Sequence, residues 1–301
     1  MAALVMTGGT SGFGAGTARR LHDTGGRLIL GARSPGGTVG ESLPLDLASL
    51  DSVRGFAAAV QDRLGAEPID ALVLNAGIVR PDATGRSLDG HEVTFSVNHL
   101  APYLLLRLLV AHLAPGAVVV LTTSGTHDPE LKGGLAPPRH ADARLLANPS
   151  GDAAAEPTSA RAGQEAYTAS KLCSVLTVGA LADRAEIRQR DSTVLAYCPG
   201  QVFGTGLAAG LSRARRIAWR VMGTPVSAPV RRFMPTLNTR EAAGAALARL
   251  ALGEVTPPAG RSYVALRRGE LTWPEPSALA RSTDLAERLW RDSAALVGID
   301  P

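Results

Sequence analysis

The chain has 301 residues, 45% of them hydrophobic and 19% charged, so it is long enough to bury a large core and does not have the composition of a disordered protein. Its 31 Lys and Arg against 27 Asp and Glu leave a net charge of +4 without a basic run interleaved with aromatics, which argues against nucleic-acid binding. Two cysteines exclude a disulfide framework, and we see no apolar stretch of membrane-spanning length, so we expect a cytoplasmic protein without stable membrane insertion.

Short apolar runs alternate with helical patterns along the chain, which predicts a parallel sheet with helices on both faces. Strands are expected at residues 3–7, 27–31, 42–45, 69–74, 117–122, 193–196 and 262–266. Helices are expected at residues 14–23, 49–64, 88–114, 166–184, 239–252 and 285–297. The third of these helices should bend or break near Asn98 or Pro102.

Two segments interrupt this alternation. Residues 33–43 are too short and too rich in glycine for a crossover helix, so we predict a loop. Residues 127–164 form a long Pro/Gly/Ala-rich insertion, and a loop of this length is usually functional or disordered. We expect part of it to pack beside an active site and residues 151–161 to be mobile.

A glycine-rich turn separates the first predicted strand from the first predicted helix. Glycines let the backbone approach a pyrophosphate closely, and the N-terminus of the following helix would face the phosphates. A tight strand–helix connection is the alternative. The candidate cofactor-binding residues of the turn are Gly8, Thr10, Ser11, Gly12, Phe13 and Gly14.

Three segments after other predicted strands complete the candidate dinucleotide site. Arg33, beside Ser34, suits a 2′-phosphate, whereas an NAD enzyme generally has an acid there; an ordinary surface arginine is the alternative. Asp46, beside Leu47, is placed either to meet the adenine amino group or to cap the next helix. The small residues around Asn75, namely Ala76 and Gly77, let the backbone pass under the ribose, and the Asn can tie neighbouring strands.

Tyr167 and Lys171 are four residues apart and therefore share one face of a predicted helix. An ammonium beside the phenol would lower the pKa of the Tyr and make its proton transferable near neutral pH. The chain has only two lysines, Lys132 and Lys171, and an Arg could not replace a compact ammonium at such a site. An exposed helical pair is the alternative for this spacing taken alone.

Together these motifs resemble the short-chain dehydrogenase/reductase family. TGxxxGxG lies at residues 7–14, NAG at 75–77, YxxxK at 167–171 and the PG motif at Pro199 and Gly200, in the family's order. The resemblance implies an α/β fold, a doubly wound (Rossmann) seven-stranded parallel sheet in a single domain over residues 1–301. The insertion before Tyr167 and the chain's ending resemble the branch that holds retinol dehydrogenases and light-dependent protochlorophyllide reductase.

The family implies an Asn–Ser–Tyr–Lys tetrad. By position its members are Asn98, Ser124, Tyr167 and Lys171. Tyr167 would be the acid/base and Lys171 would also bind the nicotinamide ribose, while Asn98 would hold a water in a proton relay or be a structural, helix-breaking Asn. Counting along the fifth strand favours Thr123 for the hydroxyl, whereas residue type and the following Gly-Thr-His favour Ser124, which we assign.

The resemblance also places Pro199 and Gly200 at the start of a loop over the nicotinamide. There the Val202 backbone would bind the carboxamide and the Thr205 hydroxyl would support it. Residues 207–222 have apolar positions at roughly helical spacing, which indicates either a substrate lid or a helix packed on the core. Cys198 is expected to be part of the buried structure rather than of the chemistry. His127 could shuttle a proton, but a loop histidine without a catalytic role is favoured.

The resemblance therefore predicts an NADP(H)-dependent ketoreductase acting on a bulky hydrophobic small molecule, and the Ala/Arg/Gly-rich composition suggests a bacterial secondary-metabolite ketone. NADP-dependent alcohol oxidation, C=C reduction and a non-catalytic dinucleotide-sensing protein are the alternatives. Light-driven pigment reduction is disfavoured, because the photoenzyme carries a cysteine right after its Pro-Gly and this chain has Gln201. We expect no metal, and either a monomer or a homodimer formed through the long helices.

Overall fold

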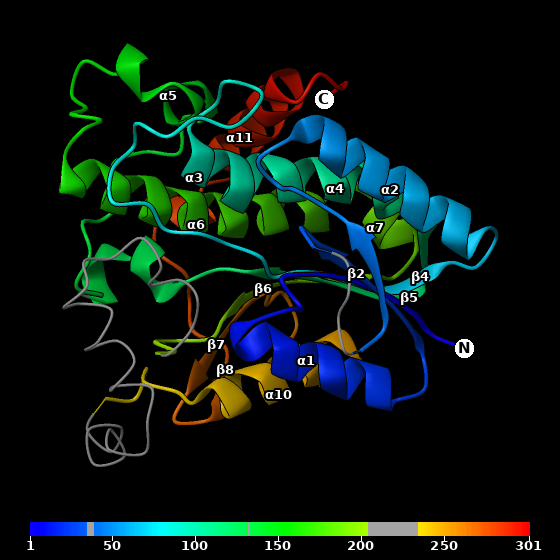
Figure 1. Ribbon diagram of the computed structural model, residues 1–301. Coiled ribbons are helices and arrows are strands. Elements are labelled where there is room, and N and C mark those ends of the chain that lie inside the picture. The colour runs from blue at the N-terminus through cyan, green and yellow to red at the C-terminus, as the bar shows by residue number, and fades with distance from the viewer. Residues whose placement is uncertain (35–38, 132, 204–233) are drawn as a thin grey trace.

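The computed structural model describes residues 1–34, 39–131, 133–203 and 234–301 (Figure 1). These residues form an eight-stranded sheet in the order β3-β2-β1-β4-β5-β6-β7-β8, in which β1 to β7 are parallel and β8 is antiparallel to β7. The strands are β1 (Ala3–Thr7), β2 (Arg27–Ala32), β3 (Glu41–Pro44), β4 (Ile69–Leu74), β5 (Leu113–Thr122), β6 (Thr193–Cys198), β7 (Tyr263–Arg267) and β8 (Glu270–Thr272).

The predicted doubly wound fold is confirmed, with one correction to the predicted seven strands. The eighth strand, β8, spans only three residues at the edge of the sheet, and so short a segment carries too little alternation to be recognised. It follows β7 through a tight reversal in which Arg268 (φ +52°) and Gly269 (φ +80°) both take left-handed backbone.

Helices cover both faces of the sheet (Figure 1). Helices α1 and α10 lie on one face, while α2, α4 and α6 lie on the other, with α5 and α11 beyond them. The bounds are α1 (Gly12–Asp23), α2 (Leu50–Leu64), α3 (Val93–Phe95), α4 (Ala101–Leu109), α5 (Ala143–Ala147), α6 (Ala160–Ala182), α7 (Ala185–Gln189), α10 (Arg240–Ala251) and α11 (Thr283–Leu296).

The core lies in two layers, one on each face of the sheet, because alternate residues of a strand point to opposite faces. In β1, Leu4 and Met6 belong to the layer under α1 and α10, whereas Ala3 and Val5 belong to the layer under α2, α4 and α6. Both faces of a parallel sheet are therefore covered, which is why its strands are almost continuously apolar.

The helix predicted at residues 88–114 begins later, at Val93, because Gly90 has a left-handed backbone (φ +84°) in the preceding turn. It is interrupted by a π-helical turn, Ser96–Leu100, so the predicted irregularity near Asn98 is confirmed. One helical stretch of the described residues, Val93–His112, is long and apolar enough to cross a membrane, which the sequence analysis overlooked. Its most apolar window is 83% buried inside the protein, as expected of a core helix.

The insertion before Tyr167 forms short helices rather than one open loop. The 3-10 turns Gly125–His127 and Pro129–Leu131 are followed by α5 and by the turn Pro149–Gly151. Residues 151–161, which we expected to be mobile, are held by hydrogen bonds such as the one from Ala83 N to Pro157 O (2.8 Å), and they lead directly into α6.

Helix α11 packs over the outer surface of α4 and α6. The Trp290 ring meets the Tyr103 ring edge-on with centroids 5.0 Å apart, and the Tyr103 hydroxyl donates to Trp290 O (2.9 Å). The His99 imidazole bonds to the Ser293 hydroxyl (2.8 Å). This packing covers the side of α6 that faces away from the sheet, and every residue of the middle turns of α6, from Ala166 to Val178, is buried.

Candidate active site

The predicted functional residues gather at the carboxyl ends of the central strands. The strand order reverses between β1 and β4, because the chain runs outward from β1 to β3 and then returns to place β4 on the other side of β1. Ligands of open α/β sheets bind in the crevice outside such a switch point. The turn after β1, the segment after β4 and the loops after β5 and β6 all open there.

The glycine turn fits tightly against the segment after β4. A Cβ at Gly8 (φ +69°) would lie 2.7 Å from Ala76 N, and one at Gly14 would lie 2.0 Å from Gly8 O. Asn75 donates from Nδ2 to Gly8 O (3.1 Å) and accepts at Oδ1 from the Thr122 hydroxyl (3.0 Å). Asn75 therefore ties the turn to the end of β5, as expected, and the glycines are required by this close approach.

The N-terminus of α1 has the features of an anion site. Ser11 is its N-cap, but the serine side chain makes no capping hydrogen bond, and the first turn contains no acidic residue. The backbone N–H groups of that turn thus have no side-chain acceptor, and the helix dipole favours negative charge there. Together with the glycine turn, this geometry fits the pyrophosphate of a dinucleotide.

Two predicted residues lie where the adenosine half of a dinucleotide would extend. Arg33, with Ser34, is exposed directly after β2. Asp46 is exposed after β3, beside the half-buried Leu47, and accepts a backbone N–H at 2.9 Å. The cap of α2 is instead Ser49, which accepts a backbone N–H at 3.2 Å. The helix-cap alternative for Asp46 is therefore wrong, and its second carboxylate oxygen makes no hydrogen bond within the described part of the chain.

The loop after β6 is anchored by a residue that the sequence analysis missed. Gly200 has a left-handed backbone (φ +73°), and a Cβ there would lie 2.7 Å from Asn238 Nδ2. That amide nitrogen donates to Pro199 O (3.0 Å), and Val202 is buried. A polar residue directly before the Thr239 helix cap was the only signal of this role. Thr205 and the predicted lid, residues 207–222, lie outside the described residues.

The Tyr167 and Lys171 side chains meet in a buried cluster, 6% and 4% exposed respectively. Lys171 Nζ lies 5.8 Å from the centroid of the Tyr167 ring and donates to Thr122 O (2.9 Å). A Cβ at Gly77 would lie 3.4 Å from the same Nζ, so the segment after β4 passes directly beside the ammonium. The exposed-pair alternative is therefore wrong.

The pKa of Tyr167 differs from the sequence-based expectation. Burial raises it to about 12, although the contact with the Ser124 hydroxyl works in the opposite direction. Burial also lowers the pKa of Lys171 to about 8. The expectation that the ammonium lowers the pKa of the phenol is wrong for this arrangement, because Nζ lies over the ring and gives a hydrogen bond to a backbone carbonyl.

The Asn98 side chain is fully engaged within the protein. Its Oδ1 accepts from Ile78 N (2.8 Å), and its Nδ2 donates to Ile78 O (2.9 Å) and to the Ser170 hydroxyl (3.0 Å). Pro102, four residues on, has no N–H to donate to the Asn98 carbonyl as an α-helical residue would. A water relay through Asn98 would therefore use its backbone carbonyl, and the π-helical turn lies at this point.

The structure separates the two candidate hydroxyls at the end of β5. Thr123 is 2% exposed and donates its hydroxyl to Lys171 O (2.7 Å). The Ser124 hydroxyl contacts Tyr167 and accepts from Thr126 N (3.3 Å) and from the Thr126 hydroxyl (3.1 Å). Because both acceptor positions of the Ser124 oxygen are filled, its own proton is free to point toward Tyr167 or a substrate oxygen.

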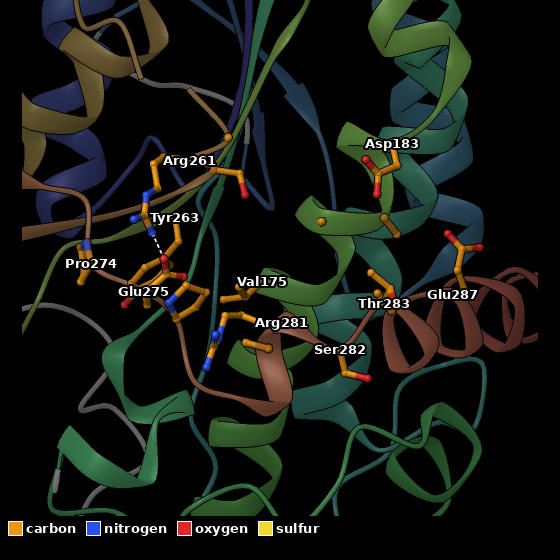
Figure 2. A pocket seen from close by; sticks show the side chains of 17 residues that line it. Val175, Asp183, Arg261, Tyr263, Pro274, Glu275, Arg281, Ser282, Thr283 and Glu287 are labelled. Carbon is orange, nitrogen blue, oxygen red and sulfur yellow. Dashed lines mark hydrogen bonds and ion pairs between the residues drawn. The ribbon is translucent and has the colours of Figure 1, made fainter. Parts of the chain in front are cut away.

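A cleft of about 220 Å³ lies between α6, the start of β7 and the approach to α11. Figure 2 shows Tyr263 and Glu275 on one side, Asp183 and Glu287 on the other, and Val175 of α6 with Arg281 between them. None of the predicted catalytic residues lines it. Within the described ranges no group of three or more His, Cys, Asp or Glu side chains could hold a metal ion.

The fold and the site define a doubly wound α/β protein with a glycine turn shaped for a dinucleotide and a buried Tyr–Lys pair. Residues 2–134 match the family described as short chain dehydrogenase. Protochlorophyllide reductase of Avena sativa is 33% identical over 232 residues, which cover 68% of this chain and 72% of that protein. The chain belongs to the short-chain dehydrogenase/reductase family.

Other similarities agree on the fold. Protochlorophyllide reductase A of Hordeum vulgare is 34% identical over 229 residues, and the match covers 68% of this chain but only 58% of that protein's length. The crystal structure of an uncharacterized protein from Mycobacterium paratuberculosis superposes with a TM-score of 0.68 and 22% identity, covering 100% of this chain and 94% of the other.

Proposed function

We propose that this protein is an NADP(H)-dependent ketoreductase that reduces the carbonyl of a bulky hydrophobic small molecule. The observation that carries the proposal is the contact between the Tyr167 and Ser124 hydroxyls, beside Lys171 and near Gly77 of the segment after β4. Two hydroxyls converging on one point, with a cation behind them, are the arrangement that a developing alkoxide needs.

A bound nicotinamide dinucleotide would supply the hydride for the carbonyl carbon. The residues of the chain do the rest. Ser124 donates a hydrogen bond to the carbonyl oxygen and so stabilises the charge that develops there. Tyr167 gives its proton to the same oxygen. In the reverse direction the same two residues would serve alcohol oxidation, and the ratio of reduced to oxidised cofactor would decide the direction.

Lys171 and Asn98 would replace the proton that Tyr167 gives up. The ammonium lies within the same buried cluster, with its pKa lowered to about 8 by burial, so it can both release and regain a proton near neutral pH. The Asn98 carbonyl lies at the π-helical turn, and the Asn98 and Lys171 side chains both lie beside Gly77.

The preference for a phosphorylated cofactor rests on Arg33. Its guanidinium is exposed at the end of β2 and makes no hydrogen bond or ion pair with residues that the structure describes. A planar guanidinium at this position suits a 2′-phosphate, while an acidic residue would repel it.

An apolar substrate is supported by leucines on the insertion. Leu131 is 42% exposed, and a Cβ at Gly125, next to Ser124, would lie 3.2 Å from its Cδ1. Leu135 is 37% exposed. The carbonyl oxygen of the next residue, Ala136, accepts a hydrogen bond from the hydroxyl of Thr168, which follows Tyr167 in the chain. Exposed leucines beside a reactive cluster favour a hydrophobic ligand. A bacterial secondary-metabolite ketone is one such substrate.

Reduction of a pigment C=C bond is the second candidate, and it is favoured by the relatives that are named protochlorophyllide reductase. Gln201 stands where the resemblance places the photoenzyme's cysteine, which weighs against light-driven chemistry. A dinucleotide-sensing protein without catalysis is a third possibility, and the intact Tyr167–Lys171 pair weighs against it.

The test is a titration of the purified protein with NADPH and with NADH, followed by nicotinamide fluorescence, for the wild type and for Arg33→Ala. We expect a strong preference for NADPH that collapses in the variant, and then NADPH consumption with a panel of hydrophobic ketones. Equal binding of both nucleotides would overturn the role of Arg33. Binding without turnover of any ketone, in the dark or in light with pigments, would favour the sensing protein.

A further inference from the structure

The loop that carries Ser124 is held from both sides by groups that the proposed reaction does not use. The Ser124 carbonyl oxygen lies 2.7 Å from His127 Nδ1, and the next backbone N–H, that of Gly125, donates to Cys198 Sγ at 3.0 Å. Both atoms belong to the peptide group that joins Ser124 to Gly125, so this one peptide group is held at its oxygen and at its N–H.

His127 is a structural partner with a defined tautomer. Because a carbonyl oxygen only accepts, Nδ1 carries the proton, and Nε2 is left to accept from Ser277 N (3.5 Å). The imidazole is buried against the Tyr263 ring, and burial lowers its pKa. Both nitrogens are occupied, which agrees with the expectation that His127 does not shuttle protons.

Cys198 has an environment unlike that of an ordinary core thiol. It is 4% exposed at the end of β6, and its sulfur accepts from Gly125 N and from the Tyr263 hydroxyl. Burial raises the pKa of the thiol, which keeps it neutral. A neutral sulfur can accept both bonds, whereas a methyl group in its place would leave the half-buried Gly125 N–H and the buried Tyr263 O–H without this acceptor.

Tyr263 connects this support to a surface of the molecule. Its hydroxyl reaches Cys198, its ring packs against His127 (centroids 5.2 Å apart, 73°), and its side chain lines the cleft of Figure 2. The support of Ser124 therefore comes from β6 and β7, which lie on the far side of β5 from the glycine turn.

We propose that Cys198, held in place by Tyr263, is a positioning residue that aims the Ser124 hydroxyl at the substrate oxygen. This inference rests on the proposed function only in so far as Ser124 orients the substrate; the control of the loop by the thiol can be tested without any substrate. Cys198 itself touches no reacting atom and forms no bond in the reaction.

The experiment compares Cys198→Ala, which cannot accept, with Cys198→Ser, which can. The matched control is Cys173→Ala, which removes the chain's other buried thiol, on α6, for which no hydrogen bond to residues 124–127 is found in the described part of the chain. The first readout is hydrogen exchange at the Gly125 amide. We expect exchange at this amide to accelerate at least roughly 10-fold in Cys198→Ala. In Cys198→Ser and in the control the exchange rate should stay close to that of the wild type.

The second readout is steady-state reduction of a ketone found in the screen above. Because a small displacement of an orienting group lowers the rate of the chemical step, kcat should fall roughly 10-fold to 100-fold in Cys198→Ala with KM nearly unchanged. Cys198→Ser should recover most of this loss. In a Ser124→Ala background, Cys198→Ala should have no further effect on kcat, since it would act only through Ser124.

The outcomes separate the two proposals. Unchanged exchange at Gly125 in Cys198→Ala overturns the positioning role, whatever the activity. A loss of kcat that persists in the Ser124→Ala background also overturns it, because a general structural defect would behave in that way. Accelerated exchange in a protein that reduces no ketone supports the control of the loop and counts against the ketoreductase instead.

Discussion

The Thr123 hydroxyl donates to the backbone carbonyl of Lys171 at 2.7 Å. This bond joins the end of β5 to the middle of α6, at the residue whose side chain enters the reactive cluster. It occupies one of the two hydroxyls that could have faced the substrate, and it leaves Ser124 as the group in contact with Tyr167.

Replacing each hydroxyl should therefore have a different effect. Ser124→Ala should lower kcat by about 10²- to 10³-fold, as loss of an oxyanion donor does, with little change in stability. Thr123→Val should lower the free energy of unfolding by about 1 kcal/mol or more, because it leaves the Lys171 carbonyl without this donor, while most of the activity remains. Kinetics and urea denaturation on both variants would check this, and the reverse pattern would assign the catalytic hydroxyl to Thr123.

Two glycines of α1 provide a paired test of the dinucleotide site. A Cβ at Gly14 would lie 2.0 Å from Gly8 O, so Gly14→Ala should displace the turn and abolish NADPH binding. A Cβ at Gly16 would meet nothing within 4 Å, so Gly16→Ala should keep binding and add about 0.5–1 kcal/mol of stability. Fluorescence titration and thermal unfolding would measure both. Tight NADPH binding by Gly14→Ala would contradict this account of the turn.

The buried His99 should make the protein sensitive to acid. Burial lowers its pKa from 6.5 to about 3, in a position between the Phe95 and Tyr103 rings. As the pH falls through this interval the unfolded chain takes up a proton that the folded chain refuses, so stability is lost at up to about 1.4 kcal/mol per pH unit.

A His99→Gln variant, compared at matched pH values by urea denaturation, should show a flatter decline between pH 6.5 and 4 than the wild type. The control is His112→Gln at an exposed position, which should keep the wild-type pH dependence. Parallel curves for wild type and His99→Gln would mean that other groups cause the acid sensitivity.

Trp290 should be among the most important side chains for the docking of α11. Its ring is 5% exposed, and the guanidinium groups of Arg107 and Arg184 lie 5.1 Å and 4.6 Å from its centroid. Trp290→Ala should cost about 3–5 kcal/mol, whereas Trp290→Phe should keep part of the packing. The measurement is the free energy of unfolding in urea, and a loss below about 1 kcal/mol would show that α11 is not held by this ring.

The same helix bears on the state of assembly. The resemblance to the family left two states open, a monomer and a homodimer formed through the long helices. In the structure α11 covers the outer side of α4 and α6. We therefore expect a monomer of 31.1 kDa by light scattering. A stable dimer would have to use another surface, or displace α11.

Much of this protein could be predicted from its sequence, because the relevant signals are local. Strand β1, the turn from Gly8 to Gly14 and the four-residue spacing of Tyr167 and Lys171 each follow from neighbouring residues, and the order of the motifs indicated the doubly wound fold. The irregularity near Asn98 was also predictable, since Pro102 lacks a backbone N–H.

Only the tertiary structure decided relations between residues far apart in the chain. The choice between Thr123 and Ser124 depends on how β5 meets α6, and the role of Asn238 depends on its reach to the loop after β6. The pKa of Tyr167 rises to about 12 because the fold buries the phenol, which the helical spacing could not reveal. Local patterns determine which groups are present and on which element they lie, whereas burial and long-range hydrogen bonds, which determine how those groups behave, exist only once the chain has folded.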